Sequence, residues 1–431
     1  MDGALRDEVV GLARDLIRVD TTNPPGRETA AARVLEQYLT SNGVSCELVA
    51  RDPDRANLIA RIPGLGDGPS IALLGHTDVV YADPADWRGD PFSGDVLDGH
   101  LWGRGALDMK GHTACNAVTL ALLARSGLRP RGDVLLIAEA DEEDGAGDVG
   151  MSWLVHERPD LRTDYALNEG GGYRIVLADG RAVYYLAAAE KATMPVRVIV
   201  HGQSGHASIP TSGENALVKC APVLERLAAH SAEIELVPEV AAMLDALVPG
   251  GSLDDRIDRA RRLHPAIDHD LPAMMATTIA PTMATASSKR NVIPARAEIT
   301  CDCRVLPGTT VETLLTEVRT VLEGLDVTVE SIEPASGGTR SPLDTPLHRA
   351  IVAEIRQREP DALVVPSICV GFTDSHYVRE AFGAVAYGFF PARYTQSELL
   401  ETIHAADERV DVRDLVEAVE FNAAVVRRVA G

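Results

Sequence analysis

Two periodicities of apolar residues alternate along the first part of the chain. Spacings of three and four residues predict helices at about 4–18, 28–42 and 109–126. Short unbroken apolar runs predict buried strands at Asn57–Ile62, Ile71–Gly75, Val134–Ala138 and Tyr165–Leu167. Strands that alternate with helices predict an α/β domain whose largely parallel sheet is covered by helices on both faces.

The pattern changes after about residue 191. Apolar strand-like runs at Met194–Val200, Thr277–Thr282, Ala297–Val305 and Val327–Ile332, with helical periodicity at 213–230 and 311–324, follow the order β-α-β-β-α-β. This order predicts a ferredoxin-like α+β unit. The α/β pattern then returns, with helices expected at about 345–358, 375–381 and 411–429 and strands at 362–368 and 384–389.

The simplest domain organisation is therefore a discontinuous one. We expect an α/β domain made of residues 1–191 and 338–431, with a smaller α+β lid domain, residues 192–337, inserted into it. A charged and proline-rich stretch at about 232–272 interrupts the α+β pattern. We interpret it as a partly helical insertion whose use the sequence does not reveal.

Charge and composition narrow the classes of function. The 431 residues include 64 acidic and 41 basic side chains, which give a formal charge of −23. Such a field repels phosphate backbones and anionic lipid surfaces, so we expect neither a nucleic-acid nor a membrane partner. No apolar run reaches the ~18 residues that a membrane span needs. The first residues lack the basic and apolar regions of a secretory signal, and the six cysteines are scattered, so we expect a cytoplasmic protein with reduced thiols.

Acidic and histidine residues follow several of the predicted strands. The strand at 71–75 ends in GHTD, so Asp78 lies two residues after His76 and can fix the tautomer that a metal-binding histidine needs. Asp108 precedes the helix at 109–126, where an ordinary N-cap is an alternative interpretation. Taken singly, the GHTD segment could equally be an ordinary turn with a satisfied histidine.

Further acids follow the next two strands. ADEEDG, residues 140–145, brings four acids together, so one carboxylate could bind a cation while its neighbour stays free as a general base. A solvated acidic loop is the alternative. Glu169 in LNEGGG and His404 before the last helix complete the series. Together His76, Asp108, Glu143, Glu169 and His404 supply six ligand contacts if Asp108 bridges, which suits a pair of zinc ions.

The chain resembles the M20 family of co-catalytic zinc peptidases and amidohydrolases, which includes aminoacylase-1, glutamate carboxypeptidase and succinyl-diaminopimelate deacylases. The matching motifs are GHTD (75–78), GRGALDMKG (103–111), DEED (141–144), NEGG (168–171), GQSGHAS (202–208), NVIPA (291–295), DCRVLPG (302–308), GFTDS (371–375) and His404. They occur in the family's order and span nearly the whole chain.

The resemblance implies roles for the matched residues. One zinc would bind His76, Asp108 and Glu169, and the other Asp108, Glu143 and His404. Glu142 would be the general base, Asp78 would orient His76, and the Asp108–Met109 peptide would be cis. His206, on the lid domain and often supplied by the partner subunit of a homodimer, would stabilise the oxyanion. Substrate-binding positions would be Asn291, Arg304, Gly371 and Thr373.

One position departs from the family's pattern. Aminoacylase-1 relatives often have arginine where this chain has His376, and histidine is a weaker, pH-dependent anion clamp. Arg379, one helical turn later, could compensate. Arg304 could bind a substrate carboxylate or simply pair with a nearby acid.

We therefore predict a zinc-dependent hydrolase that cleaves an amide bond in a peptide or an N-acyl amino acid. The zinc ions, two per chain, could be replaced by cobalt or manganese. The alternatives are a dipeptidase or carboxypeptidase rather than a deacylase, and a non-catalytic metal-binding protein on the same scaffold.

Overall fold

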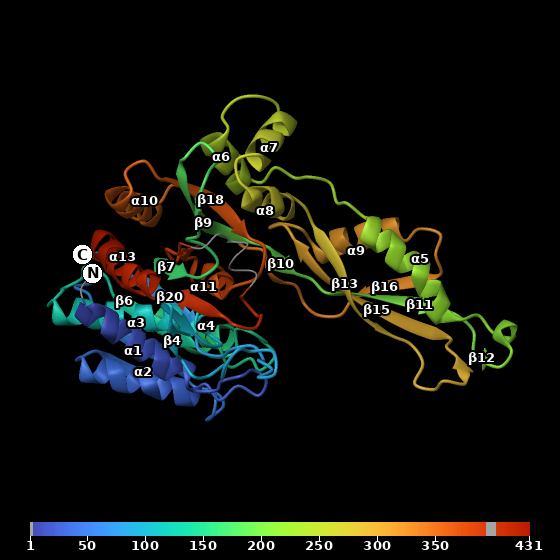
Figure 1. Cartoon of the computed structure of the whole chain (residues 1–431), viewed down its shortest axis with the longest axis horizontal. Coiled ribbons are helices and arrows are strands. Elements are labelled where there is room, and N and C mark those ends of the chain that lie inside the picture. The colour runs from blue at the N-terminus through green and yellow to red at the C-terminus, as the bar shows by residue number, and fades with distance from the viewer. Residues whose placement is uncertain (1–2, 394–401) are drawn as a thin grey trace.

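A large mixed β-sheet forms the centre of the protein, as a computed structural model that describes residues 3–393 and 402–431 shows (Figure 1). Its strand order is β1-β2-β6-β3-β7-β19-β9-β18, with β8 paired to β9. The bounds are β1 Ser45–Val49, β2 Asn57–Ile62, β3 Ile71–His76, β6 Val134–Glu139, β7 Tyr165–Asn168, β8 Arg174–Val176, β9 Ala182–Glu190, β18 Leu363–Cys369 and β19 Val385–Gly388.

The centre of this sheet is parallel and its flanks are not. Strands β6, β3, β7 and β19 are parallel, whereas β2 pairs antiparallel with β6 and β1 pairs antiparallel with β2. Strands β9 and β18 are parallel to each other and antiparallel to β19. The expected largely parallel sheet is therefore a mixed sheet with a parallel core, and the carboxyl ends of β3, β6 and β7 lie along one edge.

Helices cover both faces of this sheet, as the buried strands predicted. Neighbouring residues of a strand point to opposite faces, so Leu73 joins one apolar core and Leu74 joins another. The first core also includes α1 Gly3–Ile17, α2 Thr29–Ser41, α3 Lys110–Arg125, α10 Pro346–Arg358 and α13 Val412–Ala430. The second includes α4 Met151–Glu157 and α11 Ser375–Phe382. A small sheet of β4 Val96–Leu97, β5 His100–Trp102 and β20 Arg409–Asp411 lies beside them.

A second sheet extends away from the first (Figure 1). Its strands β16-β11-β15-β13 follow the order of a ferredoxin-like unit, and α5 Ala216–Ala229 and α9 Val311–Val321 share its apolar core. The strands are β10 Ala192–Thr193, β11 Val196–His201, β13 Thr278–Thr285, β15 Arg296–Val305, β16 Val327–Ser331 and β17 Ser336–Gly337, and at its tip β12 Gly205–His206 pairs with β14 Val292–Ile293. The exact domain bounds stay a prediction.

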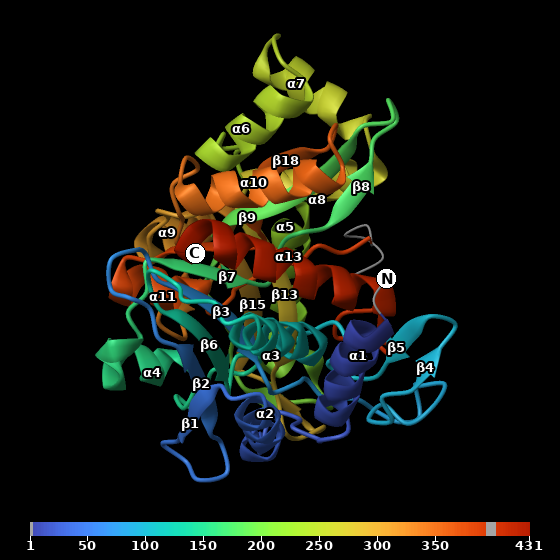
Figure 2. The same ribbon diagram turned by 90° about the vertical axis from the view of Figure 1, so that its left-hand side faces the viewer.

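The charged insertion of the α+β unit forms three helices, α6 Pro238–Leu247, α7 Leu253–Arg261 and α8 Pro265–Met275. Their buried side chains share an apolar core with β8, β9 and β18 of the large sheet (Figure 2). The buried Lys191 donates from its Nζ to the carbonyl oxygens of Ala273 (3.1 Å) and Ala276 (2.8 Å). A cation at a helix C-terminus stabilises the unpaired carbonyls there, so Lys191 fixes the end of α8.

Strand β9 was not predicted from the sequence, although all nine of its residues are buried. The strand reads AVYYLAAAE, and its alanines have low strand propensity. Burial on both faces also removes the alternation that marks a half-exposed strand. In the described ranges 3–393 and 402–431, no helix combines the length and apolar character that crossing a bilayer would require.

The buried position of β9 makes a direct prediction about stability. Replacing the fully buried Leu186 with alanine should lower the free energy of unfolding by about 2–5 kcal/mol, because the removed methyl groups leave a cavity. Urea denaturation of Leu186→Ala measures this loss. The matched control is Leu65→Ala at an exposed turn, which should change stability by roughly 0.5 kcal/mol or less. Equal values for the two variants would contradict the placement of β9.

Candidate metal centre

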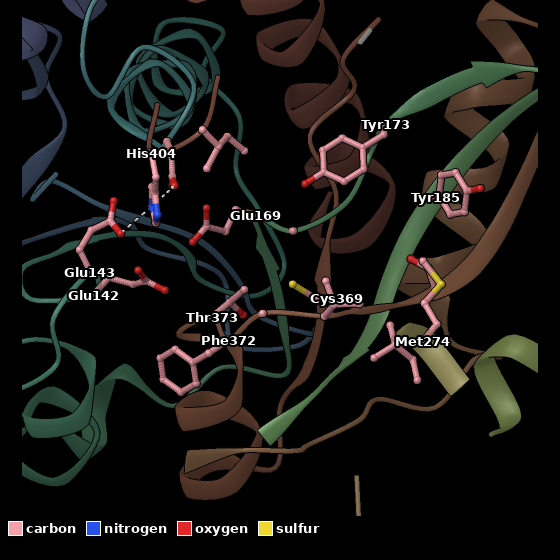
Figure 3. Close-up of a pocket in the computed structure, with 17 residues that line it drawn as sticks. Glu142, Glu143, Glu169, Tyr173, Tyr185, Met274, Cys369, Phe372, Thr373 and His404 are labelled. Carbon is pink, nitrogen blue, oxygen red and sulfur yellow. Dashed lines mark ion pairs between the residues drawn. The ribbon is translucent and has the colours of Figure 1, made fainter. Parts of the chain in front are cut away.

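The predicted metal-binding residues meet at the carboxyl edge of the parallel strands. His76 is the last residue of β3, Glu142 and Glu143 follow β6, and Glu169 follows β7. Asp108 lies just before α3, and the Asp108–Met109 peptide is cis, as the resemblance implied. Figure 3 shows Glu142, Glu143, Glu169 and His404 around one pocket.

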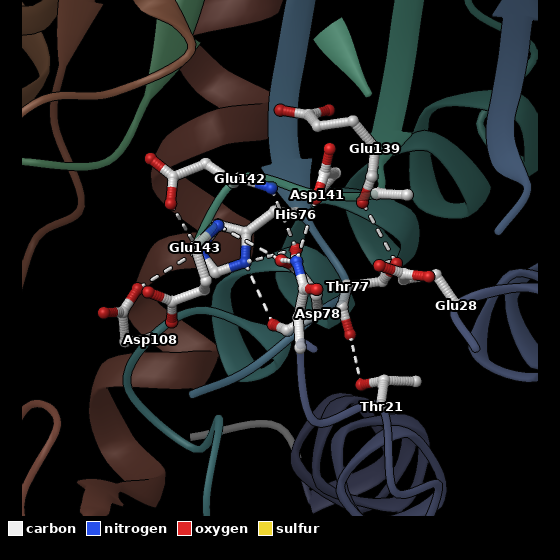
Figure 4. A network of polar contacts seen from close by, with 12 residues as sticks. Thr21, Glu28, His76, Thr77, Asp78, Asp108, Glu139, Asp141, Glu142 and Glu143 are labelled. Atoms are coloured by element: carbon white, nitrogen blue, oxygen red, sulfur yellow. Dashed lines mark hydrogen bonds and ion pairs between the residues drawn. The ribbon is translucent and has the colours of Figure 1, made fainter. Parts of the chain in front are cut away.

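Two groups of side chains are close enough to hold a metal ion each. The first consists of His76, Asp108 and Glu169, and its ligand atoms lie within 4.8 Å of one another. His76 Nε2 is 3.2 Å from Asp108 Oδ1 and 3.8 Å from Glu169 Oε1. Figure 4 shows the imidazole directed toward the Asp108 carboxylate.

The second group consists of Asp108, Glu143 and His404. His404 Nε2 lies 3.1 Å from Asp108 Oδ2 and 3.0 Å from Glu143 Oε2. The two Asp108 oxygens thus face different histidines, which is the arrangement a bridging carboxylate requires. The structure brings together all five residues that the sequence predicted as ligands, in the two predicted sets.

The electrostatics of this cluster fit divalent cations. Burial, together with the charge of Asp108, raises the pKa of Glu143 to about 7, and the same two causes raise the pKa of Glu169 well above its ordinary value. Hydrogen bonds to Asp108 and Glu143 raise the pKa of His404 to about 10. Buried Oε1 of Glu143 has no hydrogen-bond partner. Nitrogen and oxygen donors around an excess of buried negative charge are the donor set that zinc accepts.

Asp78 connects the first histidine to the acidic loop. One of its carboxylate oxygens is 3.4 Å from His76 Nδ1, and the two oxygens accept the backbone N–H groups of Glu142 (3.2 Å) and Glu143 (3.1 Å). A single buried carboxylate therefore orients the imidazole and the segment that carries two of the site's acids (Figure 4). Such outer contacts orient the groups that bind a metal.

Behind Asp78 lies a buried polar network that the sequence analysis did not find. The Asn23 side-chain amide donates to Asp78 (2.9 Å) and to Asp141 (3.0 Å). Arg55 pairs with Asp141 (3.1 Å) and with the fully buried Glu28. The TTNPPG segment, which the sequence analysis treated only as a loop, supplies Asn23.

Glu408 orients the segment that carries Asp108, as Asp78 orients the acidic loop. Its fully buried carboxylate accepts the backbone N–H groups of Gly105 (3.1 Å), Leu107 (2.7 Å) and Asp108 (2.9 Å), and it pairs with Arg104 at 2.6 Å. Glu408 was not among the residues predicted from the sequence. Its signal was weak, because an acid four positions after His404 resembles many others in an acidic chain.

Some of the predicted substrate-binding residues line the pocket and His376 does not. Gly371 and Thr373 line the pocket beside the donor groups. His376 is buried outside the lining of that pocket, where burial lowers its pKa to about 4 and its ring lies against Phe372 and Tyr377. A neutral, enclosed imidazole is a poor anion clamp.

The four remaining basic or polar candidates lie outside the lining of that pocket. Arg379 pairs with the buried Glu190 at 3.0 Å, so its charge is already compensated. Arg304 pairs with Asp302 at 2.8 Å, which agrees with the alternative that the sequence left open. His206 and Asn291 are neighbours at the tip of the second sheet, remote from the cluster in this chain (Figure 1).

Comparison with known proteins identifies the family. Residues 72–428 match the model of peptidase family M20/M25/M40, so the chain belongs to that family and is a metallohydrolase. It is 29% identical over 431 residues to a succinyl-diaminopimelate desuccinylase of Methylobacterium radiotolerans, covering 95% of this chain and 93% of the relative.

Two solved structures share the fold. A metallo-carboxypeptidase of the M20 family from Sulfolobus solfataricus superimposes with a TM-score of 0.75 at 15% identity, covering 98% of this chain and 99% of that one. A dinuclear metal-binding M20 peptidase from Bacillus subtilis gives 0.58 at 15% identity, covering 99% and 98%. At these identities the likeness describes the fold, which agrees with the predicted α/β class.

The role of Glu408 can be tested by a single-atom exchange. Glu408→Gln should lower the free energy of unfolding by about 3–5 kcal/mol, because it leaves Arg104 buried without its counter-charge. It should also lower metal content, since the Asp108 segment loses its anchor. Glu312→Gln, which alters an exposed pair with Arg319, is the control and should cost about 0–1 kcal/mol. Chemical denaturation and metal analysis of both variants provide the readouts; undiminished metal content in Glu408→Gln would contradict the anchoring role.

Proposed function

We propose that the protein is a two-metal amidohydrolase that cleaves an amide bond in a peptide or an N-acyl amino acid. The observation that carries this proposal is the shared Asp108, whose two oxygens face the two donor groups. Family membership supports hydrolysis, and the named relatives act as a desuccinylase and as peptidases. We propose zinc as the metal, with cobalt or manganese able to replace it.

The donor groups would hold the metals as two three-residue sets. His76, Asp108 and Glu169 form one, and Asp108, Glu143 and His404 form the other. When bound, two such cations polarise an amide carbonyl and lower the pKa of an attacking water. The residues themselves fix this geometry, because Asp78 and Glu408 hold the segments that carry them.

Glu142 is placed for proton transfer. It lines the pocket, belongs to neither donor set, and its Oε2 lies 4.0 Å from His76 Nε2. Burial, with the charge of Glu169, raises its pKa well above the ordinary value of a glutamate. A carboxylate with a raised pKa accepts a proton from water more readily and can return it to the leaving amine.

The oxyanion donor would come from a second copy of the chain. His206 is exposed at the tip of the second sheet, whereas the cluster lies on the large sheet. The outer face of α5 exposes Leu217 and Val218, and β13 is an edge strand that exposes Met283. Unpaired edge strands and apolar patches are typical of surfaces that pair with another chain. We therefore propose a homodimer through the second unit, with His206 of one copy serving the site of the other.

The base assignment predicts a specific loss. Glu142→Gln should retain its metal content and fold while kcat falls by ~10²–10⁴, because the amide cannot accept the proton. Asp144→Asn in the same acidic loop is the matched control, since Asp144 is exposed and outside both donor sets. Turnover of an N-acetyl amino acid and metal analysis give the two readouts. Comparable kcat in the two variants would remove Glu142 from the mechanism.

The dimer assignment predicts rescue between two inactive variants. Glu142→Gln and His206→Ala should each be nearly inactive alone. After mixing and exchange, about a quarter of the parent activity should return, because half of the dimers are mixed and one of their two sites is intact. The same mixing with Val218→Glu in both chains should abolish rescue and give monomers by light scattering. No rescue from stable mixed dimers would contradict the shared site.

A further inference from the structure

The pocket continues beyond the donor groups into an apolar recess. Tyr173, Tyr185, Met274 and Ile368 line this recess, which we define by these four residues, within a cavity of about 220 Å³. Figure 3 shows Tyr185 and Met274 on the side away from His404 and Glu143. The wall therefore combines the loop after β7, strand β9, helix α8 and strand β18.

No lysine or arginine is among the described residues that line this pocket. The nearby basic side chains have partners elsewhere. Arg379 pairs with Glu190, and Lys191 donates to the end of α8. Arg304 pairs with Asp302. A carboxylate on the part of the substrate that enters the recess would thus lose water without gaining a counter-charge, which is strongly unfavourable.

A cationic substituent finds no carboxylate among the four side chains that define the recess. Asp270, one helical turn before Met274, lies outside the pocket lining, and its Oδ1 is 2.7 Å from His269 Nδ1. Its buried Oδ2 has no hydrogen-bond partner among the described residues, and burial raises the pKa of this carboxyl. Burial raises the pKa of both Tyr173 and Tyr185, so both phenols stay neutral. The recess therefore presents carbon, one methionine sulfur and neutral hydroxyl groups.

We infer that the recess binds a neutral, apolar substituent next to the scissile amide, either an aliphatic or aromatic acyl group or an apolar side chain, and that Met274 of the insertion helps to select it. This inference rests on the proposed function. It separates this chain from the relatives named succinyl-diaminopimelate desuccinylase, because both the succinyl group and the side chain of diaminopimelate end in charged groups. It also gives the insertion a use, since α8 carries Met274 and Lys191 fixes the end of that helix.

The first test compares substrates of matched shape and different charge. One series contains N-pentanoyl-, N-succinyl- and N-(4-aminobutanoyl)-alanine, and the other contains the N-acetyl derivatives of leucine, aspartate and lysine. In at least one series the neutral member should have a kcat/KM at least tenfold above both charged members, and the series that shows this identifies which side of the amide enters the recess. A charged member that equals or exceeds the neutral one in both series overturns the inference.

The second test changes the wall itself. Met274→Lys should lower kcat/KM for the preferred neutral substrate at least tenfold and narrow or reverse its advantage over the anionic one. Met274→Ala, which removes bulk without adding charge, should move the preference toward a longer or larger neutral group. Leu65→Lys at an exposed turn is the control and should leave all ratios unchanged. If Met274→Lys does not fold, Met274→Ala still tests the inference. Unchanged kcat/KM ratios between substrates in Met274→Ala would contradict the role of Met274 in selecting the substituent.

The substrate series distinguish failure of the proposed function from failure of the inference about the recess. If no substrate in either series, and no dipeptide, is hydrolysed with metal present, the proposed function fails. If hydrolysis depends on metal but charged substituents are preferred, the proposed function stands and the inference about the recess fails.

Discussion

Repulsion among buried carboxylates is the constraint on which the rest of this structure depends. Asp108, Glu142, Glu143 and Glu169 converge at one edge of the sheet, largely away from water, so the arrangement needs either protons on some carboxylates or compensating positive charge. Without metal, protonated His76 and His404 supply part of that charge. Divalent cations bound in the two donor sets would replace those protons, because a histidine binds a metal in its neutral form. Asp108 is central because its carboxylate takes part in both sets.

The surrounding fold holds this unfavourable cluster in place through fixed hydrogen bonds. Asp78 fixes His76 and the backbone of the acidic loop, while Glu408 fixes the backbone that carries Asp108. Each of these acids is itself buried and fully engaged, so the position of the donor atoms is set by parts of the chain far apart in sequence. The N-terminal segment contributes through Asn23, which reaches both Asp78 and Asp141.

The sequence predicted those features that depend on local pattern. Helix periodicity located α3, α10 and α13, and the acids after β3, β6 and β7 revealed the metal centre because parallel strands end at the same edge. It failed where the deciding contacts are long-range. The alanine-rich β9 carries little local signal, and Glu408 and Asn23 gain their importance only from partners about 300 and 55 positions away.

The substrate residues illustrate the same limit. A motif could point to Arg304 and His376, but it could not reveal that Asp302 already pairs with the first or that the second is enclosed by aromatic rings. The recess could not be predicted from the sequence either, because four separate elements build it. One of these elements, α8, belongs to the insertion for which the sequence indicated no use.

Anomalous diffraction from crystals grown with zinc tests the central claim most directly. The account predicts two peaks on either side of the Asp108 carboxylate, one beside His76 and Glu169 and the other beside Glu143 and His404. A single peak, or peaks that do not share Asp108, would contradict it.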